Sequence, residues 1–196
     1  MLSNYHAHSN YTSDAQCTIE QHCKAAVEQG LDEICFTQHL YYPVIPELGE
    51  NYDCPDSVTI LPNDVSRYFE DVENARLAFP GLKIKIGFEA DYIEGREERL
   101  QKFLESKQLD FVLGSVHFIQ TRGDLYTIEN VRRMVSETSS VDFVRRYFEK
   151  VLKSVECGIF DSISHASLFS YSFDKLGISS PPFESYPISL MKLEKK

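Results

Sequence analysis

Short apolar runs alternate with longer amphipathic stretches along this chain of 196 residues. The apolar runs predict strands near residues 2–6, 33–37, 83–88, 110–116 and 159–163. Parallel strands need a long crossover between them, and that crossover is usually a helix. The alternation therefore predicts an α/β fold of about five β/α units with a parallel sheet.

The stretches between the strands carry signals for helix ends. Thr18 and Gln21 have the spacing of a capping box, and Gly30 is suited to end the helix that they begin. A second helix is predicted to start after residue 63 or 64 and to stop before Pro80. Further helices are predicted over residues 95–106 and 129–157, and residues 40–62 are predicted to form a long loop.

Residue types that bind metals stand at the ends of these predicted strands. They are His6, His8, His39, Glu89, His117 and His165, and Asp14 follows the first pair in a loop. The strands of a parallel barrel end at one face, so ligands that are far apart in the sequence can meet there. Each residue alone is weak evidence, because a single histidine at a strand end is usually an ordinary polar residue. Their ordered recurrence predicts a metal site.

The spacing of these residues suits more than one divalent ion. His6 and His8 are two residues apart on an extended segment, so both imidazoles point to the same side. Neutral imidazoles bind borderline cations such as Zn²⁺, Mn²⁺ or Fe²⁺, and a carboxylate such as Glu89 can bridge two of them. Paired metals about 3.5–4 Å apart suit the hydrolysis of phosphate esters.

Net charge, apolar runs and cysteine content indicate which partners and which compartment to expect. The net charge of −10 argues against non-specific binding to nucleic acid or to an anionic membrane. No apolar run reaches the roughly 20 residues that span a bilayer, and no signal peptide is visible, so we expect a cytoplasmic protein. The five cysteines form no C-x-x-C pair and are expected to be reduced thiols.

Several motifs in their order resemble the PHP superfamily (polymerase and histidinol phosphatase). They are H-A-H, S-D, T-Q-H, G-F-E-A-D-Y, L-D-F-V-L-G-S-V-H-F and D-S-I-S-H. Within the superfamily the chain is most similar to the monofunctional histidinol-phosphate phosphatases. The likeness covers residues 1 to about 178, and residues 179–196 form an atypical tail, so we expect one PHP-type domain over 1–196.

The resemblance implies a distorted (β/α)₇ TIM-like barrel with up to three divalent metal ions, which can be Mn, Fe or Zn. His6 and His8 would bind the first metal, and Glu89 would bridge it to a second that His117 and His165 complete. Asp14 and His39 would bind the third. The implied reaction is hydrolysis of L-histidinol phosphate to L-histidinol and phosphate in histidine biosynthesis. Metal-activated hydroxide would carry it out, with Glu89 and His117 acting through the metals and Arg122 contacting phosphate.

The chain also departs from the family pattern. It lacks the late D-x-H motif that completes the first and third metal sites, and it stops at Lys196 before the last strands of the barrel. We therefore expect a truncated, incomplete barrel whose open edge can support self-association. Gln38 stands where the family often has an acid, and we expect it to support His39 less strongly than a carboxylate would. Two alternatives stay open: an inactive or regulatory fragment, and another PHP phosphoesterase.

Overall fold

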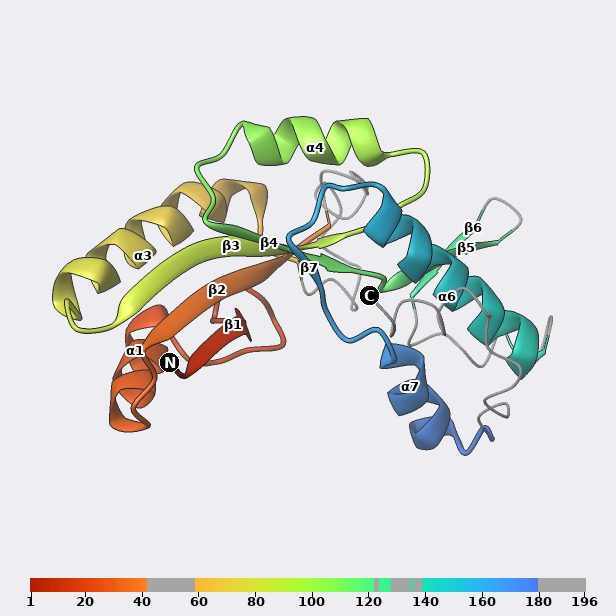
Figure 1. The fold of residues 1–196 in the computed structure, drawn as a ribbon, viewed down its shortest axis with the longest axis horizontal. Coiled ribbons are helices and arrows are strands. Elements are labelled where there is room, and N and C mark those ends of the chain that lie inside the picture. The colour runs from red at the N-terminus through yellow and green to blue at the C-terminus, as the bar shows by residue number, and fades with distance from the viewer. Residues whose placement is uncertain (42–58, 122–123, 128–134, 136–138, 180–196) are drawn as a thin grey trace. The chain divides into compact units, whose positions relative to one another are not determined.

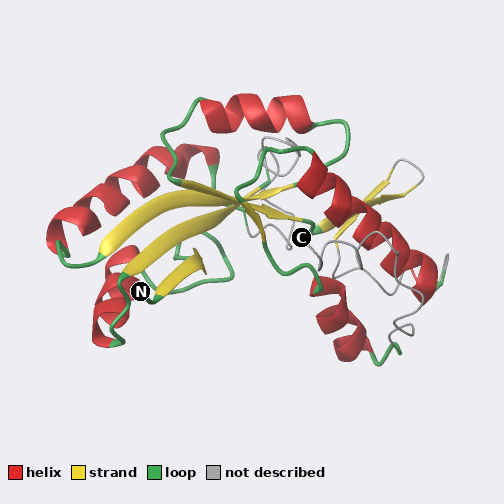
Figure 2. Cartoon of the chain, viewed as in Figure 1, coloured by secondary structure: helices red, strands yellow, loops and turns green. Residues whose placement is uncertain are grey.

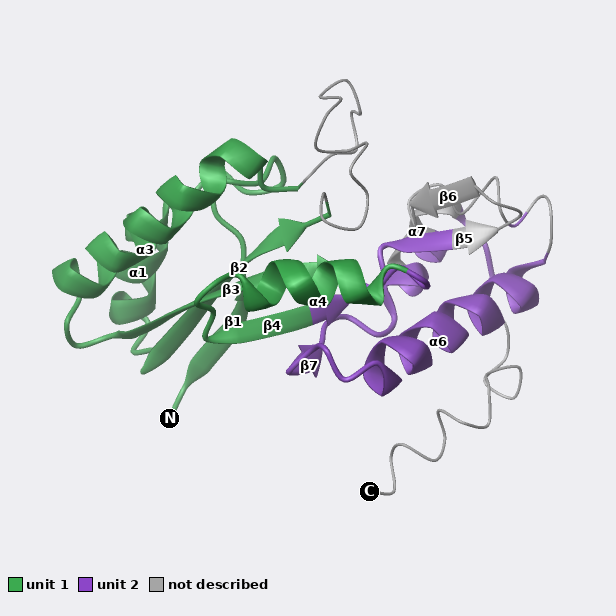
Figure 3. Cartoon of the chain, turned by 90° about the horizontal axis from the view of Figure 1, so that it is seen from above, with its two compact units in different colours: residues 1–91, 96–113 green, residues 92–95, 114–196 purple. Residues whose placement is uncertain are grey.

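The computed structural model describes residues 1–41, 59–121, 124–127, 135 and 139–179. The other residues lie outside the described part, and with them the predictions for Arg122, for most of the 40–62 loop and for the tail from residue 180. The chain divides into two compact units (Figure 3). Unit 1 comprises residues 1–91 and 96–113, and unit 2 comprises residues 92–95 and 114–196.

Unit 1 contains the parallel sheet that the sequence predicts (Figure 2). Its strands lie in the order β1-β2-β3-β4, and both β1/β2 and β2/β3 are parallel. Their bounds are β1 Ser3–Ala7, β2 Glu33–Leu40, β3 Lys83–Asp91 and β4 Phe111–Ser115. All eight residues of β2 are buried, as expected for a strand that has neighbours on both sides.

The helices of unit 1 begin and end at recognisable residues. In α1 (Ile19–Glu28), Thr18 and Gln21 form the predicted capping box, and Gly30 follows the helix with φ of 73°. A short 3₁₀ turn, η1 (Pro62–Asp64), leads into α3 (Val65–Ala78), which packs against β3 (Figure 1). Helix α4 (Glu97–Glu105) connects β3 with β4.

A buried tyrosine ties α3 to the sheet. The hydroxyl of Tyr68 lies 2.9 Å from the carbonyl oxygen of Phe36 in β2 and 3.0 Å from that of Gly87 in β3. Tyr68, Phe36 and Phe88 are completely buried and form the centre of the unit 1 core. This packing holds β2 and β3 together just before the residues near their ends that carry the predicted chemistry.

Unit 2 is built around α6 (Ser140–Glu156). The end of β4 pairs with β7 (Ser162–Ile163), and Ser164 N–H donates to the Gly114 carbonyl at 2.8 Å. An antiparallel hairpin of β5 (Phe118–Thr121) and β6 (Asp124–Thr127) and the helix α7 (Leu168–Leu176) complete the unit. Its core is aromatic and includes Phe143, Tyr147, Phe148, Phe169 and Phe173.

The α/β class and the strand positions predicted from the sequence are confirmed. Three details differ. Within the helix predicted over 129–157, the described residues show a helix over Ser140–Glu156 that begins after an extended N-cap, Ser139, while residues 129–134 and 136–138 lie outside the described part. The β5/β6 hairpin and α7 were not predicted. Among the described residues no helix is long and apolar enough to cross a membrane.

Candidate metal centre

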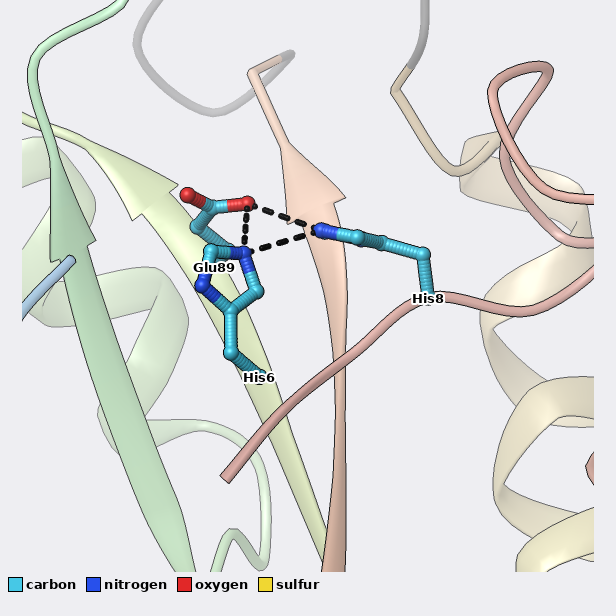
Figure 4. Close-up of side chains that lie close together, drawn as sticks. All are labelled: His6, His8 and Glu89. Atoms are coloured by element: carbon cyan, nitrogen blue, oxygen red, sulfur yellow. Dashed lines mark hydrogen bonds and ion pairs between the residues drawn. The ribbon is translucent and has the colours of Figure 1, made fainter. Parts of the chain in front are cut away.

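Three predicted ligands meet in unit 1 (Figure 4). The Nε2 atoms of His6 and His8 are 3.0 Å apart, and each lies 3.2 Å from Oε2 of Glu89. His6 is in β1, His8 follows that strand, and Glu89 is near the end of β3. The two imidazoles therefore share one side of the extended segment, as the alternation of side chains predicts.

Strand register brings a fourth residue to the same place. His39 in β2 is paired with Glu89 in β3, so the two side chains emerge side by side. Nδ1 of His39 is 3.0 Å from Glu89 Oε2, and its Nε2 is 3.4 Å from Asp14 Oδ2. The rings of His8 and His39 stack with centroids 4.2 Å apart. His8, Asp14 and His39 thus form a second group of potential ligands, which shares His8 with the first.

Between Asn4 and Ala7 the pairing of β1 with β2 is irregular. Such a bulge changes the direction of nearby side chains and is common beside functional sites. His6 lies inside this irregular stretch, and its backbone N–H donates to the side-chain oxygen of Asn4 at 2.9 Å. His6 thus reaches Glu89 from an irregular part of β1.

The electrostatics of the centre are dominated by one buried carboxylate. Glu89 is 0% exposed, and an isolated charge there would be very costly. Burial disfavours the charged form of His39, but hydrogen bonds to Asp14 and Glu89 outweigh it and raise the pKa of His39 to about 9. Without a metal, a protonated His39 therefore offsets one of the two negative charges of Asp14 and Glu89.

The other titratable groups are shifted in directions that suit ligands. Burial lowers the pKa of His8, and nearby His39 adds to this shift, so the His8 imidazole is kept neutral. Burial opposes ionisation of Asp14, but hydrogen bonds from His39 and Thr12 hold the pKa of its carboxyl below the usual range. A neutral imidazole and an ionised carboxylate are the forms that donate lone pairs to a cation.

The remaining predicted ligands lie in unit 2. His117 follows β4, His165 follows β7, and their rings contact each other edge to face with centroids 5.0 Å apart. Oγ of Ser164 is 3.3 Å from Nδ1 of His165, and the Tyr147 hydroxyl donates to the His165 carbonyl at 3.0 Å. The structure thus brings His117 and His165 together within this unit.

Two residues at the centre were missed by sequence reasoning. The hydroxyl of buried Tyr41 is 3.1 Å from Nδ1 of His39. Tyr41 stands two positions after His39, and the same period-two alternation would have found it. His22 in α1 is half-buried and hydrogen-bonds the backbone of His8.

The donor set of unit 1 fits a divalent cation. Imidazole nitrogens and carboxylate oxygens are the usual ligands of Zn²⁺ and related borderline ions. The donor atoms within each group already lie within 4.8 Å of one another, and they come from β1, the following loop, β2 and β3. A cation at this position can replace the His39 proton as the charge partner of Glu89 and Asp14.

Comparison with known proteins assigns the family. The model of the PHP domain family matches residues 4–181. The chain belongs to the PHP domain family. The two groups of potential ligands are therefore part of a PHP domain.

Individual PHP relatives are longer than this chain. A curated protein of Deinococcus radiodurans is 29% identical over 171 residues, which cover 85% of this chain and 61% of the relative. A histidinol-phosphatase of Lactococcus lactis is 30% identical over 118 residues, which cover 59% of this chain and 39% of the relative. The chain thus spans less than two thirds of the length of these curated relatives.

A solved structure supports the fold. Histidinol phosphate phosphatase from Lactococcus lactis, in complex with zinc, L-histidinol and phosphate, has a TM-score of 0.55 at 22% identity. The match covers 94% of this chain and 62% of that one. At this level of identity the likeness concerns the fold, and it confirms the predicted PHP-type α/β architecture.

Proposed function

We propose that this PHP domain is a metal-dependent phosphomonoesterase that hydrolyses L-histidinol phosphate to L-histidinol and phosphate. The observation that carries the proposal is the convergence of His6, His8 and Glu89 at distances of 3.0–3.2 Å. The Lactococcus lactis relative, whose structure holds zinc, L-histidinol and phosphate, supports the choice of substrate. This activity would place the protein in histidine biosynthesis and in the cytoplasm.

The residues of the centre have separate parts in this proposal. His6, His8 and Glu89 would hold one ion, and His8, Asp14 and His39 would hold another. Glu89 also lies 3.0 Å from His39, so it would bridge the two ions. His117 and His165 are proposed as further metal ligands. Zinc, manganese and iron all suit these donors. Bound ions supply a Lewis acid, which activates water and neutralises charge on the transferring phosphoryl group.

Charge explains why such a centre would need metal to bind its substrate. The chain has a net charge of −10, and the centre contains two carboxylates, Asp14 and Glu89. A phosphate monoester is itself anionic, so these charges would repel it. Divalent cations held by the two groups would reverse the local field and make an anion-binding site.

The test is phosphate release from L-histidinol phosphate by the purified chain with added Mn²⁺ or Zn²⁺. We expect turnover that a chelator and the substitution Glu89→Gln abolish. Glu105→Gln, on the exposed side of α4, is the matched control and should retain full activity. Phosphate release from para-nitrophenyl phosphate and from a phosphotyrosyl peptide is measured alongside. We expect release from L-histidinol phosphate to be the fastest of the three.

The outcomes separate the alternatives. Faster release from another ester would favour a different PHP phosphoesterase. Metal binding without release from any ester would contradict the enzyme and favour a binding or regulatory role.

A further inference from the structure

The loop after β1 carries two potential ligands, His8 and Asp14, but has no regular secondary structure. Such a loop needs specific contacts if its ligands are to be held in place. The structure supplies them from β2. Ser9 N–H donates to Oε1 of Gln38 at 3.0 Å, and Nε2 of Gln38 donates to Oγ of Ser9 at 2.8 Å. Gln38 and Ser9 are both completely buried.

Ser9 in turn hydrogen-bonds a residue further along the loop. Its carbonyl accepts from the backbone N–H of Thr12 at 3.0 Å and from the Thr12 hydroxyl at 3.2 Å. The Thr12 hydroxyl has one proton, which it shares between this carbonyl and the carboxylate of Asp14. A continuous chain of contacts therefore runs from Gln38 through Ser9 and Thr12 to Asp14.

The position of Gln38 in β2 explains why its side chain reaches Ser9 in the loop. It immediately precedes His39, and neighbouring side chains of a strand point to opposite faces. His39 faces Glu89 and Asp14, while Gln38 faces the buried backbone of the loop. This differs from the sequence-based expectation, in which Gln38 supported the His39 ring itself.

We propose that Gln38 is a positioning residue that clasps Ser9 and so holds His8 and Asp14 against His39. An amide suits this place because it both accepts and donates, matching the backbone N–H and the hydroxyl of Ser9. It does so without adding another buried charge beside Glu89 and Asp14. The inference rests on the proposed function only in taking a divalent cation as the ligand of the centre.

Gln38→Met is the direct test, because it keeps the side-chain length and removes both hydrogen bonds. Two quantities are measured on the full chain. In metal-free protein, amide hydrogen exchange of Ser9 and Thr12 should become at least about 10-fold faster, since the clasp protects these groups. The Kd for Mn²⁺ or Zn²⁺, from competition with a fluorescent chelator, should rise about 10- to 100-fold, as is typical when the support of a ligand is lost.

Two further variants separate positioning from general stability. Gln38→Glu is expected to be protonated at this buried place beside Glu89 and Asp14, and a carboxylic acid both accepts and donates as the amide does, so it should restore slow exchange and metal binding. Gln101→Met replaces an exposed glutamine of α4 and should leave both quantities at the wild-type value. Should Gln38→Met fail to fold, Ser9→Ala removes one hydrogen bond of the clasp, and it should speed exchange and weaken binding by a smaller factor.

A folded Gln38→Met with wild-type exchange and wild-type Kd would overturn the proposal. If Gln38→Met does not fold, a Ser9→Ala variant with wild-type exchange and wild-type Kd would overturn it instead. If the wild-type chain bound no metal but exchange still accelerated in Gln38→Met, the clasp would stand and the proposed function would fail.

Discussion

At the scale of single residues, the centre depends on where neighbouring strands place their side chains. His6 and His8 lie on one side of an extended segment, because side chains alternate along it. Pairing of His39 with Glu89 depends on the register of β2 and β3, which no local pattern fixes. The Gln38–Ser9 clasp joins residues 29 positions apart and could not be anticipated for the same reason.

Glu89 is the residue on which both ligand groups converge, because it lies 3.2 Å from His8 and 3.0 Å from His39. Glu89→Gln keeps the shape of the side chain and removes its charge. We therefore expect the metal content after dialysis, measured by mass spectrometry, to fall by more than one site. Glu105→Gln serves as the control and should bind as the wild type. Equal metal content in both variants would contradict the bridging position of Glu89.

His39 makes the stability of the metal-free protein depend on pH. Burial lowers its pKa, but hydrogen bonds to Asp14 and Glu89 outweigh burial and raise the pKa to about 9. In the unfolded chain a histidine has a pKa of about 6.5. The stabilisation is complete below about pH 6.5 and is lost as pH rises toward 9. His8 acts in the opposite direction at the lower end of this window, because its pKa is lowered in the folded state while the unfolded chain still holds part of a proton there. The fall due to His39 is therefore clearest above about pH 7.5.

The measurement is urea unfolding in excess chelator between pH 6.5 and 8.5. We expect the free energy of unfolding to fall by up to about 1.4 kcal/mol per pH unit, the value for one proton held only by the native state. His39→Asn should show a flatter dependence. Parallel curves for the two proteins would refute a protonated His39 in the metal-free centre.

At the scale of elements, the predictions were correct where a local signal exists. The apolar runs located all the strands of unit 1, and the capping box fixed the start of α1. Inside the helix predicted over 129–157, α6 begins at a capping signal of its own, Ser139 with Asp142 three residues later. The β5 and β6 strands have only four residues each, too few to show a clear alternation of apolar and polar positions. Helix α7 begins without a side-chain cap, so no local signal marks its start.

A glycine in β3 shows how closely the elements approach one another. A Cβ added to Gly87 would lie 2.2 Å from the carbonyl oxygen of Phe111, which is backbone and cannot rotate away. The Gly87 carbonyl also accepts the hydrogen bond of Tyr68. Gly87→Ala should therefore push β3 away from β4 and destabilise the protein by about 1–3 kcal/mol, as overpacking does.

Gly81→Ala is the matched control, because a Cβ there would meet nothing within 4 Å. It should be neutral or slightly stabilising, since alanine reduces the entropy of the unfolded chain. Urea unfolding of both variants at one pH gives the comparison. A Gly87→Ala variant as stable as Gly81→Ala would show that the strands can separate without cost.

At the scale of the whole molecule, the metal centre joins segments that are distant in the sequence. His6 and Glu89 are 83 positions apart, and the segments between them form most of unit 1. A cation bound by both would link them only in the folded state, because the unfolded chain does not hold these donors together. Metal binding should therefore act on the folding equilibrium of the chain.

Mass action sets the size of this effect. At a free metal concentration 100 times the Kd, a ligand that binds only the native state stabilises it by about 2.7 kcal/mol. Heating the protein with Mn²⁺ or Zn²⁺ should accordingly raise its melting temperature, and the rise should grow with metal concentration and vanish with a chelator. Glu89→Gln should lose most of the shift, while Glu105→Gln should keep it. An identical shift in Glu89→Gln would mean that the stabilising ion binds elsewhere and that Glu89 is not one of its ligands.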